Sequence, residues 1–348
     1  MTILAESVDI VIGVDTHKHT HAAAVMNPAG GVVATLSVET TPAGYARLFE
    51  LADAHGSARV WAIEGTGSYG VGLCRFLQDR GEKVLEVDRA KRVPRRSGAK
   101  TDQIDAVRAG REALARPDLP NPKARHERAA LAVLVNTRRS AIDAAQAAQV
   151  QLQALIVTAP EVLRDQLRRH RRDHLIAVAA QLRMRSGWDI ETVTYAAAIR
   201  DLARRVRTLH QEADRDEAEI ERLVAEWRPD LLALQGVGPI VAATILCAWS
   251  HHDRVPSEAA FAALAGVAPI PASSGMTTRH RLNRGGDRQL NRALHVIALQ
   301  RSRHDPQTRA YIERRRAEGK TDREIRRCLK RYIARRIYRQ LQQPLDAL

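Results

Sequence analysis

The sequence predicts an α/β domain with a mixed sheet, then a long helical arm, then a mainly helical C-terminal domain. Three observations predict this order. Short β-branched runs alternate with helical segments over residues 8–115. Residues 124–228 hold almost no strand signal and a single glycine, Gly187. After residue 230 the pattern is again helical, with a Gly-rich turn and a basic tail. We place the three domains at residues 1–120, 121–228 and 229–348.

The first domain opens with β-branched runs at residues 8–15, 20–26 and 31–39. The turn residues Asn27 to Gly31 separate the last two runs. Consecutive strands joined by short turns favour an antiparallel meander. The elements expected next are a helix at 43–55, a strand at 58–65, a helix at 69–80, a strand at 83–88 and a helix at 102–115. This alternation predicts helices packed on a mixed sheet.

The second domain is rich in Ala, Leu, Arg, Glu and Gln. These residues favour helices, and the length of the segment predicts two or more long ones, arranged as an α-hairpin or coiled coil. Breaks are expected near Pro160 and at Ser186-Gly187. The apolar spacing is too loose for a strict heptad zipper, so we describe the segment as a helical arm. Such an arm suggests self-association of the chain.

The chain of 348 residues carries a net charge of +15, and most of the excess lies in one segment. Residues 279–340 hold 20 Lys and Arg against 6 Asp and Glu, and residues 89–111 hold 8 against 2. A GC-rich genome explains Arg in place of Lys, but it does not explain a local scarcity of acids. A localised basic field indicates a polyanionic partner, most often nucleic acid.

Three cysteines, Cys74, Cys247 and Cys328, lie far apart in the sequence. Their spacing argues against a disulfide scaffold or a zinc ribbon and is typical of a reducing compartment. No run is apolar for long enough to form a membrane helix, and the first residues do not have the pattern of a signal peptide. We therefore expect a cytoplasmic protein with no membrane partner.

Four carboxylates stand at chemically suggestive places. Asp15 and Glu64 each come at the end of a predicted strand, and Asp102 and Asp105 share one face of a predicted helix that Thr101 can cap. Taken singly, a strand-end Asp is an ordinary turn residue, and acids in a first helical turn simply favour the helix dipole. Together the four acids predict a site for two divalent cations, because oxygen ligands suit Mg²⁺ and paired ions catalyse phosphoryl transfer.

Further candidates lie in the C-terminal domain. Gly236 and Gly238 form a turn between two helical stretches, which resembles a helix-hairpin-helix and exposes N–H groups to phosphate. An ordinary interhelical turn remains the alternative. The residues expected to contact phosphate are Arg279, Arg281, Arg284 and Arg288 in one loop-like segment, together with Lys100 near the acids.

Three histidines, His17, His19 and His21, alternate along a predicted strand and would share one face. A metal site is one interpretation of this spacing. Because the histidines stand beside predicted carboxylate ligands, we favour roles that face solvent or phosphate.

Three motifs resemble the DEDD transposases of bacterial insertion sequences. They are G-V-D-T-H-K at 13–18, E-G-T-G-S-Y at 64–69 and K-T-D-Q-I-D-A at 100–106. The resemblance extends over essentially the whole chain. It implies an RNase H-like N-terminal domain, similar to Holliday-junction resolvases, and a separate C-terminal transposase domain. It also implies that Asp15, Glu64, Asp102 and Asp105 bind the metal, expected to be two Mg²⁺ ions. Gln235 departs from this family, which often has Pro before the first glycine of the turn.

The resemblance further implies that Ser274, which precedes a glycine, is the nucleophile, with Ser273 as its near neighbour. Without the resemblance, a serine before a glycine is ordinary loop chemistry. The implied reaction cuts and rejoins DNA through a phosphoserine intermediate, guided by a noncoding bridge RNA that the element encodes. The implied assembly is a dimer or tetramer. Two other hypotheses remain open: a metal-dependent junction nuclease in which water attacks, and a non-enzymatic nucleic-acid scaffold.

Overall fold

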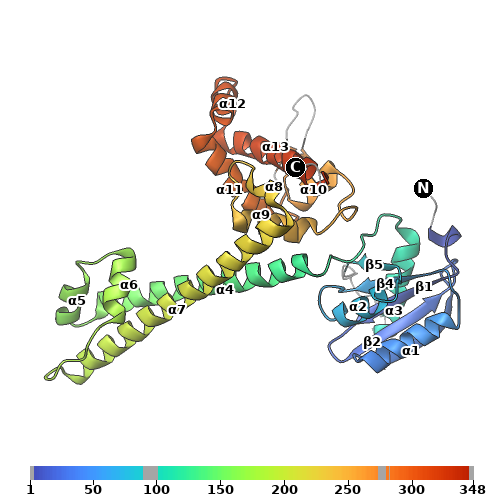
Figure 1. Ribbon diagram of the computed structural model, residues 1–348, viewed down its shortest axis with the longest axis horizontal. Helices are drawn as coiled ribbons and strands as arrows, with labels where there is room; N and C mark the ends of the chain where they lie inside the picture. Colours follow the sequence, from blue (N-terminus) through green and yellow to red (C-terminus); the bar gives the residue numbers. More distant parts are fainter. Residues whose placement is uncertain (1–3, 89–100, 273–279, 282, 345–348) are drawn as a thin grey trace. The chain divides into compact units, whose positions relative to one another are not determined.

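The computed structural model describes residues 4–88, 101–272, 280–281 and 283–344 (Figure 1). Contacts divide the chain into two compact units. One holds residues 1–124 with 253–255, and the other holds residues 125–252 with 256–348. Among the described helices, none combines the length and the apolar character that a bilayer crossing requires.

A five-stranded sheet forms the centre of the first unit. Its strands are β1 (Ile10–Thr16), β2 (Thr20–Met26), β3 (Val32–Glu39), β4 (Arg59–Glu64) and β5 (Val84–Val87), after a short 3₁₀ turn at Leu4–Glu6. The strand order is β3-β2-β1-β4-β5. β1, β2 and β3 pair antiparallel, whereas β4 and β5 run parallel to β1. The predicted meander and the predicted mixed sheet are therefore confirmed.

Helices cover both faces of this sheet because successive strand residues point to opposite sides. α1 (Pro42–Asp53) and α2 (Val71–Gln78) pack on the face that carries Ile12, Val14 and Trp61. α3 (Asp102–Ala115) packs on the other face, against Val11 and Ala62. The alternating apolar strand residues thus fill two separate cores, one on each side of the sheet.

Gly13, in the middle of β1, sets how closely α3 approaches the sheet. A Cβ at this position would lie 2.1 Å from the carbonyl oxygen of Ala106 and 2.6 Å from the backbone nitrogen of Gly110. Backbone atoms cannot move aside as a side-chain end can, so only glycine fits. Gly110 has a milder restriction, since its Cβ would meet the flexible end of Met26. The contact between Gly13 and α3 therefore fixes the height of the helix above β1.

Two long helices form the arm of the second unit. α4 (Glu127–Thr158) and α7 (Ile190–Trp227) run antiparallel, since Thr137 bonds to Asp216 at one level and Thr158 bonds to Tyr195 at another. Buried alanines of both helices let the backbones approach closely. The predicted α-hairpin is confirmed, as are the breaks: α4 ends before Pro160 and α7 begins after Gly187. Two short helices between them, α5 (Glu161–Leu167) and α6 (Arg172–Ala180), were not predicted.

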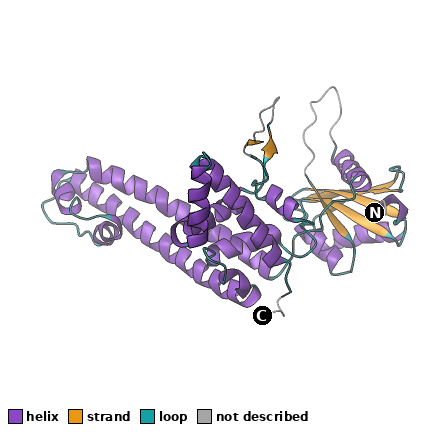
Figure 2. Ribbon diagram, turned by 90° about the horizontal axis from the view of Figure 1, so that it is seen from above, coloured by secondary structure: helices purple, strands orange, loops and turns teal. Residues whose placement is uncertain are grey.

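The C-terminal part is mainly helical, as predicted. Its helices are α8 (Pro229–Leu232), α9 (Pro239–Trp249), α10 (Glu258–Leu264), α11 (Arg288–His304), α12 (Pro306–Ala317) and α13 (Asp322–Leu341). The structure adds a two-stranded ribbon of β6 (Ile270–Pro271) and β7 (His280–Arg281), visible in Figure 2, in a segment that the sequence predicts as loop. Two-residue strands leave too short a pattern for sequence to detect.

A buried ion pair joins the end of the arm to the end of the chain. Arg228 donates to both carboxylate oxygens of Asp230, at 2.7 and 2.6 Å, and also to the backbone carbonyls of Gln340 and Leu341 at the end of α13. Burial opposes ionisation of Asp230, but hydrogen bonds from Arg228 and Gln340 keep its pKa below the ordinary value. The pair thus satisfies carbonyls that a helix C-terminus leaves without an intrahelical partner.

A second ion pair lies at the edge of the sheet. Arg59 at the start of β4 donates two hydrogen bonds to Glu82, at 2.9 and 2.8 Å, and the indole of Trp61 donates another at 2.7 Å. The bonds from Arg59, followed by the one from Trp61, lower the pKa of the Glu82 carboxyl below its ordinary value of 4.5. The pair fixes the segment before β5 to β4.

Replacing Gly13 with Ala tests the close contact. We expect Gly13→Ala to destabilise the protein by at least ~1–3 kcal/mol, because the new methyl group meets backbone that cannot yield. Gly110→Ala is the matched control with a smaller loss, since Met26 can change rotamer. Thermal unfolding followed by circular dichroism measures both variants. Equal unfolding temperatures for the two variants would contradict this account of the contact.

The Glu82 ion pair gives a pH dependence of known sign. A carboxyl with a lowered pKa stabilises the folded state above its unfolded pKa, and this contribution is lost as pH falls through the folded pKa. We therefore expect Glu82→Gln to be less stable than the parent at pH 7, with the difference shrinking below about pH 4.5. Unfolding temperatures between pH 3 and pH 7 test this, with Glu50→Gln, at an exposed position of α1, as control. A pH-independent difference would rule out the ionised pair as its cause.

Candidate active site

The carboxyl ends of β1 and β4 bring two of the predicted acids to one edge of the sheet. The two strands are parallel neighbours, with Val14 paired to Ile63. Asp15 and Glu64, one residue further along, therefore lie at the same level. Asp15 lies two residues after Gly13, so its side chain is on the same face of the sheet as α3. Glu64 is at the matching position of β4, two residues after Ala62, and is on the same face. Thr16 strengthens this edge, since its hydroxyl donates to the carbonyl of Glu64 at 2.8 Å.

The N-terminus of α3 lies near the same edge, on the face of the sheet that α3 covers. Thr101 caps the helix by accepting a hydrogen bond from the backbone nitrogen of Ile104 at 3.3 Å, as the sequence predicts. Asp102 and Asp105 occupy the first turn. Ala106, one residue further, packs over Gly13 and the alanines of β2. The positive end of the helix dipole favours carboxylates here, and Asp102 lies near the end of β1.

Three ligand-type side chains come together at this edge: Asp15, His17 and Asp102. Their ligand atoms all lie within 4.8 Å of one another. His17 Nδ1 is 3.6 Å from an Asp15 oxygen and 3.8 Å from an Asp102 oxygen. This nitrogen is buried and has no hydrogen-bond partner among the described residues. Two carboxylates around a buried imidazole nitrogen form a donor set that fits a divalent cation.

The other two predicted ligands lie nearby but outside this group of three. Glu64 is half-buried at the end of β4. Asp105, one helical turn after Asp102, forms an ion pair with Arg108 at 2.7 Å. The arrangement has one compact cluster with two more carboxylates on the adjoining strand end and helix turn. Such a layout can accommodate one ion in the cluster and further oxygen ligands around it.

The prediction for the three histidines is partly wrong. His17 is in the turn after β1, not on a strand, and it lies between two carboxylates. His21 is fully buried in β2 and stacks on Tyr45, so it faces neither solvent nor phosphate. Burial is the main cause that lowers the pKa of the His21 imidazole. His19 is exposed, as predicted. The alternation failed because β1 ends at Thr16, and the turn to β2 breaks the two-residue period.

His17 lies in the site, although the sequence pattern did not predict it there. The available signal was its position two residues after Asp15, at the end of a strand. In a continuing strand, these two residues would share a face and lie about 6.8 Å apart along it. The turn instead folds the imidazole back over the carboxylate. Only the end point of β1 decides between these outcomes.

The Gly-rich turn lies between α8 and α9, as predicted. Gly236 adopts a positive φ of 82°, and α11 packs so closely beneath it that a Cβ would lie 3.3 Å from Gln300. Gly238 is the N-cap of α9, has no side-chain cap and faces open space. Arg301 of α11, itself nearly buried, donates to the carbonyl of Gln235 at 2.8 Å and holds the turn in place. Pro239 has no N–H, so Ile240 and Val241 carry the first backbone N–H groups of α9, the kind of group that a helix N-terminus offers to an anion.

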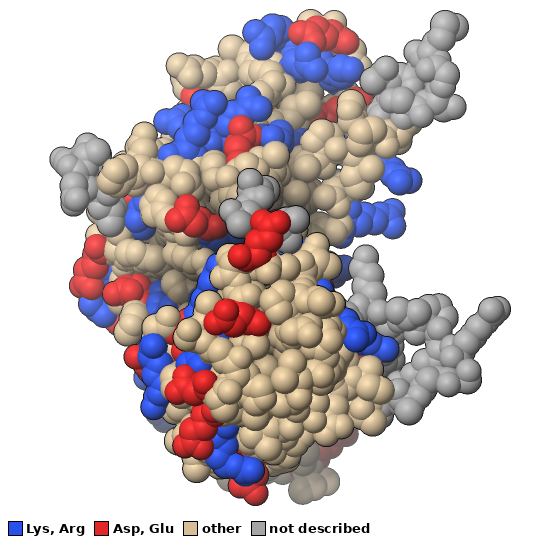
Figure 3. All heavy atoms as spheres, turned by 90° about the vertical axis from the view of Figure 1, so that its right-hand side faces the viewer, with Lys and Arg blue, Asp and Glu red and all other residues tan. Residues whose placement is uncertain are grey.

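The basic residues predicted to contact phosphate divide into two groups. Arg281 in β7, Arg284 in the following loop and Arg288 at the start of α11 are exposed and pair with no carboxylate among the described residues. Figure 3 shows Lys and Arg side chains gathered in its upper part, where Figure 1 places α11 to α13. The other two predicted phosphate contacts, Arg279 and Lys100, lie outside the described residues, as do the predicted nucleophile Ser274 and its neighbour Ser273.

Two glycines hold the base of the ribbon formed by β6 and β7. A Cβ at Gly266 would lie 2.5 Å from the carbonyl of Gly285, and one at Gly286 would lie 2.5 Å from the carbonyl of Leu264. Asn291 of α11 adds a hydrogen bond to the carbonyl of Ala265 at 2.7 Å. The segment that includes the predicted nucleophile therefore begins and ends on a closely packed base.

Comparison with known proteins gives two family matches. Residues 229–313 match the Transposase IS116/IS110/IS902 family, and residues 12–159 match a transposase family of the DEDD type associated with IS110. The chain is 26% identical over 357 aligned positions to the insertion element IS900 uncharacterized 42 kDa protein of Mycobacterium paratuberculosis, covering 88% of this chain and 89% of that protein.

A second relative is the insertion element IS110 uncharacterized 43.6 kDa protein of Streptomyces coelicolor. The identity is 35% over 133 residues, which cover 37% of this chain. This alignment spans a third of the Streptomyces protein. The family match over residues 12–159 contains the predicted metal ligands, and the match over residues 229–313 contains the predicted nucleophile Ser274.

Metal titration tests the acidic cluster. We expect Asp15→Asn to weaken Mg²⁺ binding at least about 10-fold, since it removes the most buried carboxylate of the cluster. His17→Ala has a smaller effect on Mg²⁺ than on Mn²⁺, because Mg²⁺ prefers oxygen ligands most strongly. Isothermal titration calorimetry measures both ions. Glu50→Gln on α1, across the sheet, is the control and leaves binding unchanged. Unaltered Mg²⁺ binding by Asp15→Asn would remove this cluster as the metal site.

Proposed function

We propose that this chain, which belongs to the IS116/IS110/IS902 family of transposases, cuts and rejoins DNA through a serine-linked intermediate with a divalent metal. The observation that carries the proposal is the cluster of Asp15, His17 and Asp102 at the carboxyl edge of the sheet. It lies within the segment that matches the DEDD family. Mg²⁺ is the proposed ion, and two such ions are proposed for the complete site.

The proposed ligands are Asp15, Glu64, Asp102 and Asp105, with His17 beside them. A bound divalent ion would neutralise charge that develops on phosphate oxygens during transfer. The chain's own contribution is positional. The contact between Gly13 and α3 holds Asp102 over the end of β1, and the Thr16 hydroxyl ties the ends of β1 and β4 together. Little movement is then needed for the carboxylates to bind an ion.

The proposed nucleophile is the hydroxyl of Ser274. In the first step its oxygen forms a bond to a DNA phosphorus while a phosphorus–oxygen bond of the DNA backbone breaks. The serine proton passes to a base, and the departing DNA oxygen takes up a proton. One phosphodiester replaces another, so the bond energy is kept for rejoining. In the second step a DNA hydroxyl attacks the same phosphorus and releases the serine.

The proposed nucleic-acid surface includes the first backbone N–H groups of α9 and the exposed arginines Arg281, Arg284 and Arg288. Arg279 and Lys100 belong to the same proposal. These groups contact the phosphodiester backbone and fix position without reading sequence. The resemblance to the family supports a guide RNA encoded by the element and a dimer or tetramer as the active form. Because metal ligands and serine come from separate parts of the chain, the complete site needs the two parts to meet, in one chain or between subunits.

Covalent trapping tests the serine. We expect Ser274→Ala to abolish protein–DNA adducts on denaturing gels, because no hydroxyl remains to form the phosphoserine bond. Nucleic-acid binding measured by mobility shift stays unchanged, which separates loss of chemistry from loss of folding. Ser273→Ala is the matched control and keeps the adducts. Adducts that persist in Ser274→Ala and disappear in Ser273→Ala would move the assignment by one residue.

The same variants distinguish the recombinase from a second candidate function, a metal-dependent nuclease in which water attacks. The acidic cluster alone favours that reaction, because it requires no serine. Strand cutting by Ser274→Ala at the parent rate would establish it. Loss of cutting in both Ser274→Ala and Asp105→Ala supports the recombinase. Unchanged cutting by Asp105→Ala would remove Asp105 from the site.

A further inference from the structure

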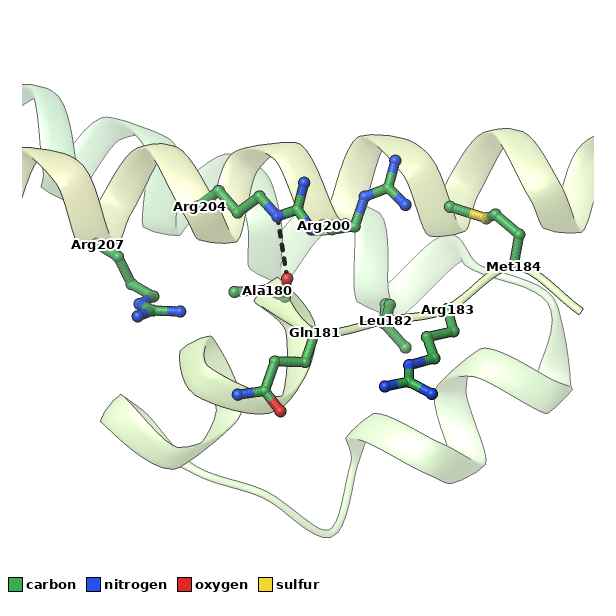
Figure 4. Close-up of a pocket in the computed structure, with 8 residues that line it drawn as sticks. All are labelled: Ala180, Gln181, Leu182, Arg183, Met184, Arg200, Arg204 and Arg207. Atoms are coloured by element: carbon green, nitrogen blue, oxygen red, sulfur yellow. Dashed lines mark hydrogen bonds between the residues drawn. The ribbon is translucent and has the colours of Figure 1, made fainter.

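The arm carries an arginine-lined pocket far along the chain from the proposed catalytic residues. It has a volume of about 700 Å³ and lies between α7 and the segment that follows α6 (Figure 4). The residues that line it are Ala180, Gln181, Leu182, Arg183, Met184, Arg200, Arg204 and Arg207. Half of these residues are arginines, and none is acidic. This composition indicates an anionic ligand.

Three of the arginines form one row on α7. Arg200, Arg204 and Arg207 have spacings of four and three residues, which place them on one face of the helix. Arg183 extends from the opposite side of the pocket, as Figure 4 shows. The open hollow therefore has cationic groups on two walls. Leu182 and Met184 add an apolar lining between them.

Most of this charge is not neutralised within the arm. Among the described residues, Arg183, Arg204 and Arg207 pair with no carboxylate. Arg204 donates only to the backbone carbonyl of Ala180, at 3.1 Å. Arg200 lies 3.5 Å from Asp201, and its Nε is buried with no hydrogen-bond partner. Elsewhere in the arm, Arg164 of α5 and Arg168 at its C-cap are paired with acids. Three cations without a carboxylate partner among the described residues thus line one pocket.

The backbone that carries these arginines is held by a packed core. A core of buried residues from α4, α5, α6 and α7 lies beneath the pocket and includes Leu182, Ile199 and Ala203. Leu182 anchors the segment that carries Arg183, and Ile199 and Ala203 alternate with the arginines of α7. The guanidinium groups are therefore presented by a packed scaffold, which lowers the entropic cost of binding.

The length of the arginine row distinguishes a polymer from a small anion. Residues 200 and 207 are separated by roughly 10 Å along the helix axis. A nucleic-acid strand advances by about 3.4 Å for each phosphate charge, so the row spans about three phosphates. A row of this length matches a polymer with several phosphates better than one free phosphate. We propose that this pocket binds the phosphodiester backbone of nucleic acid, as a site separate from the proposed catalytic surfaces.

Charge reversal at the two exposed arginines without hydrogen bonds tests the proposal. In the full chain with EDTA, Arg183→Glu/Arg207→Glu is compared with the parent by fluorescence anisotropy, using a 30-base-pair DNA duplex and a 30-nucleotide RNA hairpin. Removing two phosphate contacts lowers the salt slope by about 1.8 for duplex DNA. The loss of affinity between 50 and 200 mM salt is then about 10-fold smaller than in the parent.

The matched control is Arg169→Glu/Arg205→Glu, which makes the same charge change on exposed residues of the arm outside the pocket. We expect its salt slope to stay at the parent value, and thermal unfolding to be equal for both variants. A reduced slope with only one probe identifies whether DNA or RNA occupies the pocket. A parent-like slope with both probes, or an equal reduction in the control, would overturn the proposal. EDTA makes the result independent of the proposed metal chemistry.

Discussion

The absence of a side chain at Gly13 is the constraint on which the acidic site depends. Asp15 is held by β1, and Asp102 is held by a helix that connects to the sheet through packing rather than hydrogen bonds. The distance between them is therefore set by how closely α3 can approach. A backbone-to-backbone contact at Gly13 fixes that approach more sharply than a layer of flexible side chains would. The site is thus built by a close contact two residues away from its first ligand.

The sequence predicted the fold of the first unit well because its signals are local. Each strand and helix there lies within two residues of its predicted bounds, since β-branched runs and the Thr101 cap act over a few residues. The order of the four acids was also readable. Their distances were not, because these depend on strand register and on the height of α3. The role of His17 was lost for the same reason, as one residue in the end of β1 decides where its ring points.

The arm illustrates a different limit. Its helical composition predicted the hairpin and the breaks near Pro160 and Gly187, but it did not predict α5 and α6 between those breaks. The pocket depends on α6 and the segment after it packing against α7. Arg200, Arg204 and Arg207 are readable from the sequence as one helical face, whereas Arg183 joins them only through the tertiary fold. From the sequence, a row of arginines on one helix is typical of a solvated surface. Only the tertiary structure shows that a second segment faces the row and forms a pocket with it.

The contrast between paired and unpaired arginines changes how the net charge should be interpreted. The sequence locates the strongest basic excess between residues 279 and 340, yet five of these cations, among the described residues, are already paired with carboxylates: Arg314, Arg315, Arg316, Arg331 and Arg335. Arg316 bonds to Asp322 and Glu313, and both Arg331 and Arg335 bond to Glu258. A paired guanidinium must give up its carboxylate before it binds phosphate, so its gain on binding is reduced. Phosphate affinity should then follow the unpaired groups, which include Arg281, Arg284 and Arg288 beside the ribbon and the arginines of the pocket in the arm. The net charge indicates that the partner is a polyanion, and the unpaired guanidinium groups indicate which surfaces contact its phosphates.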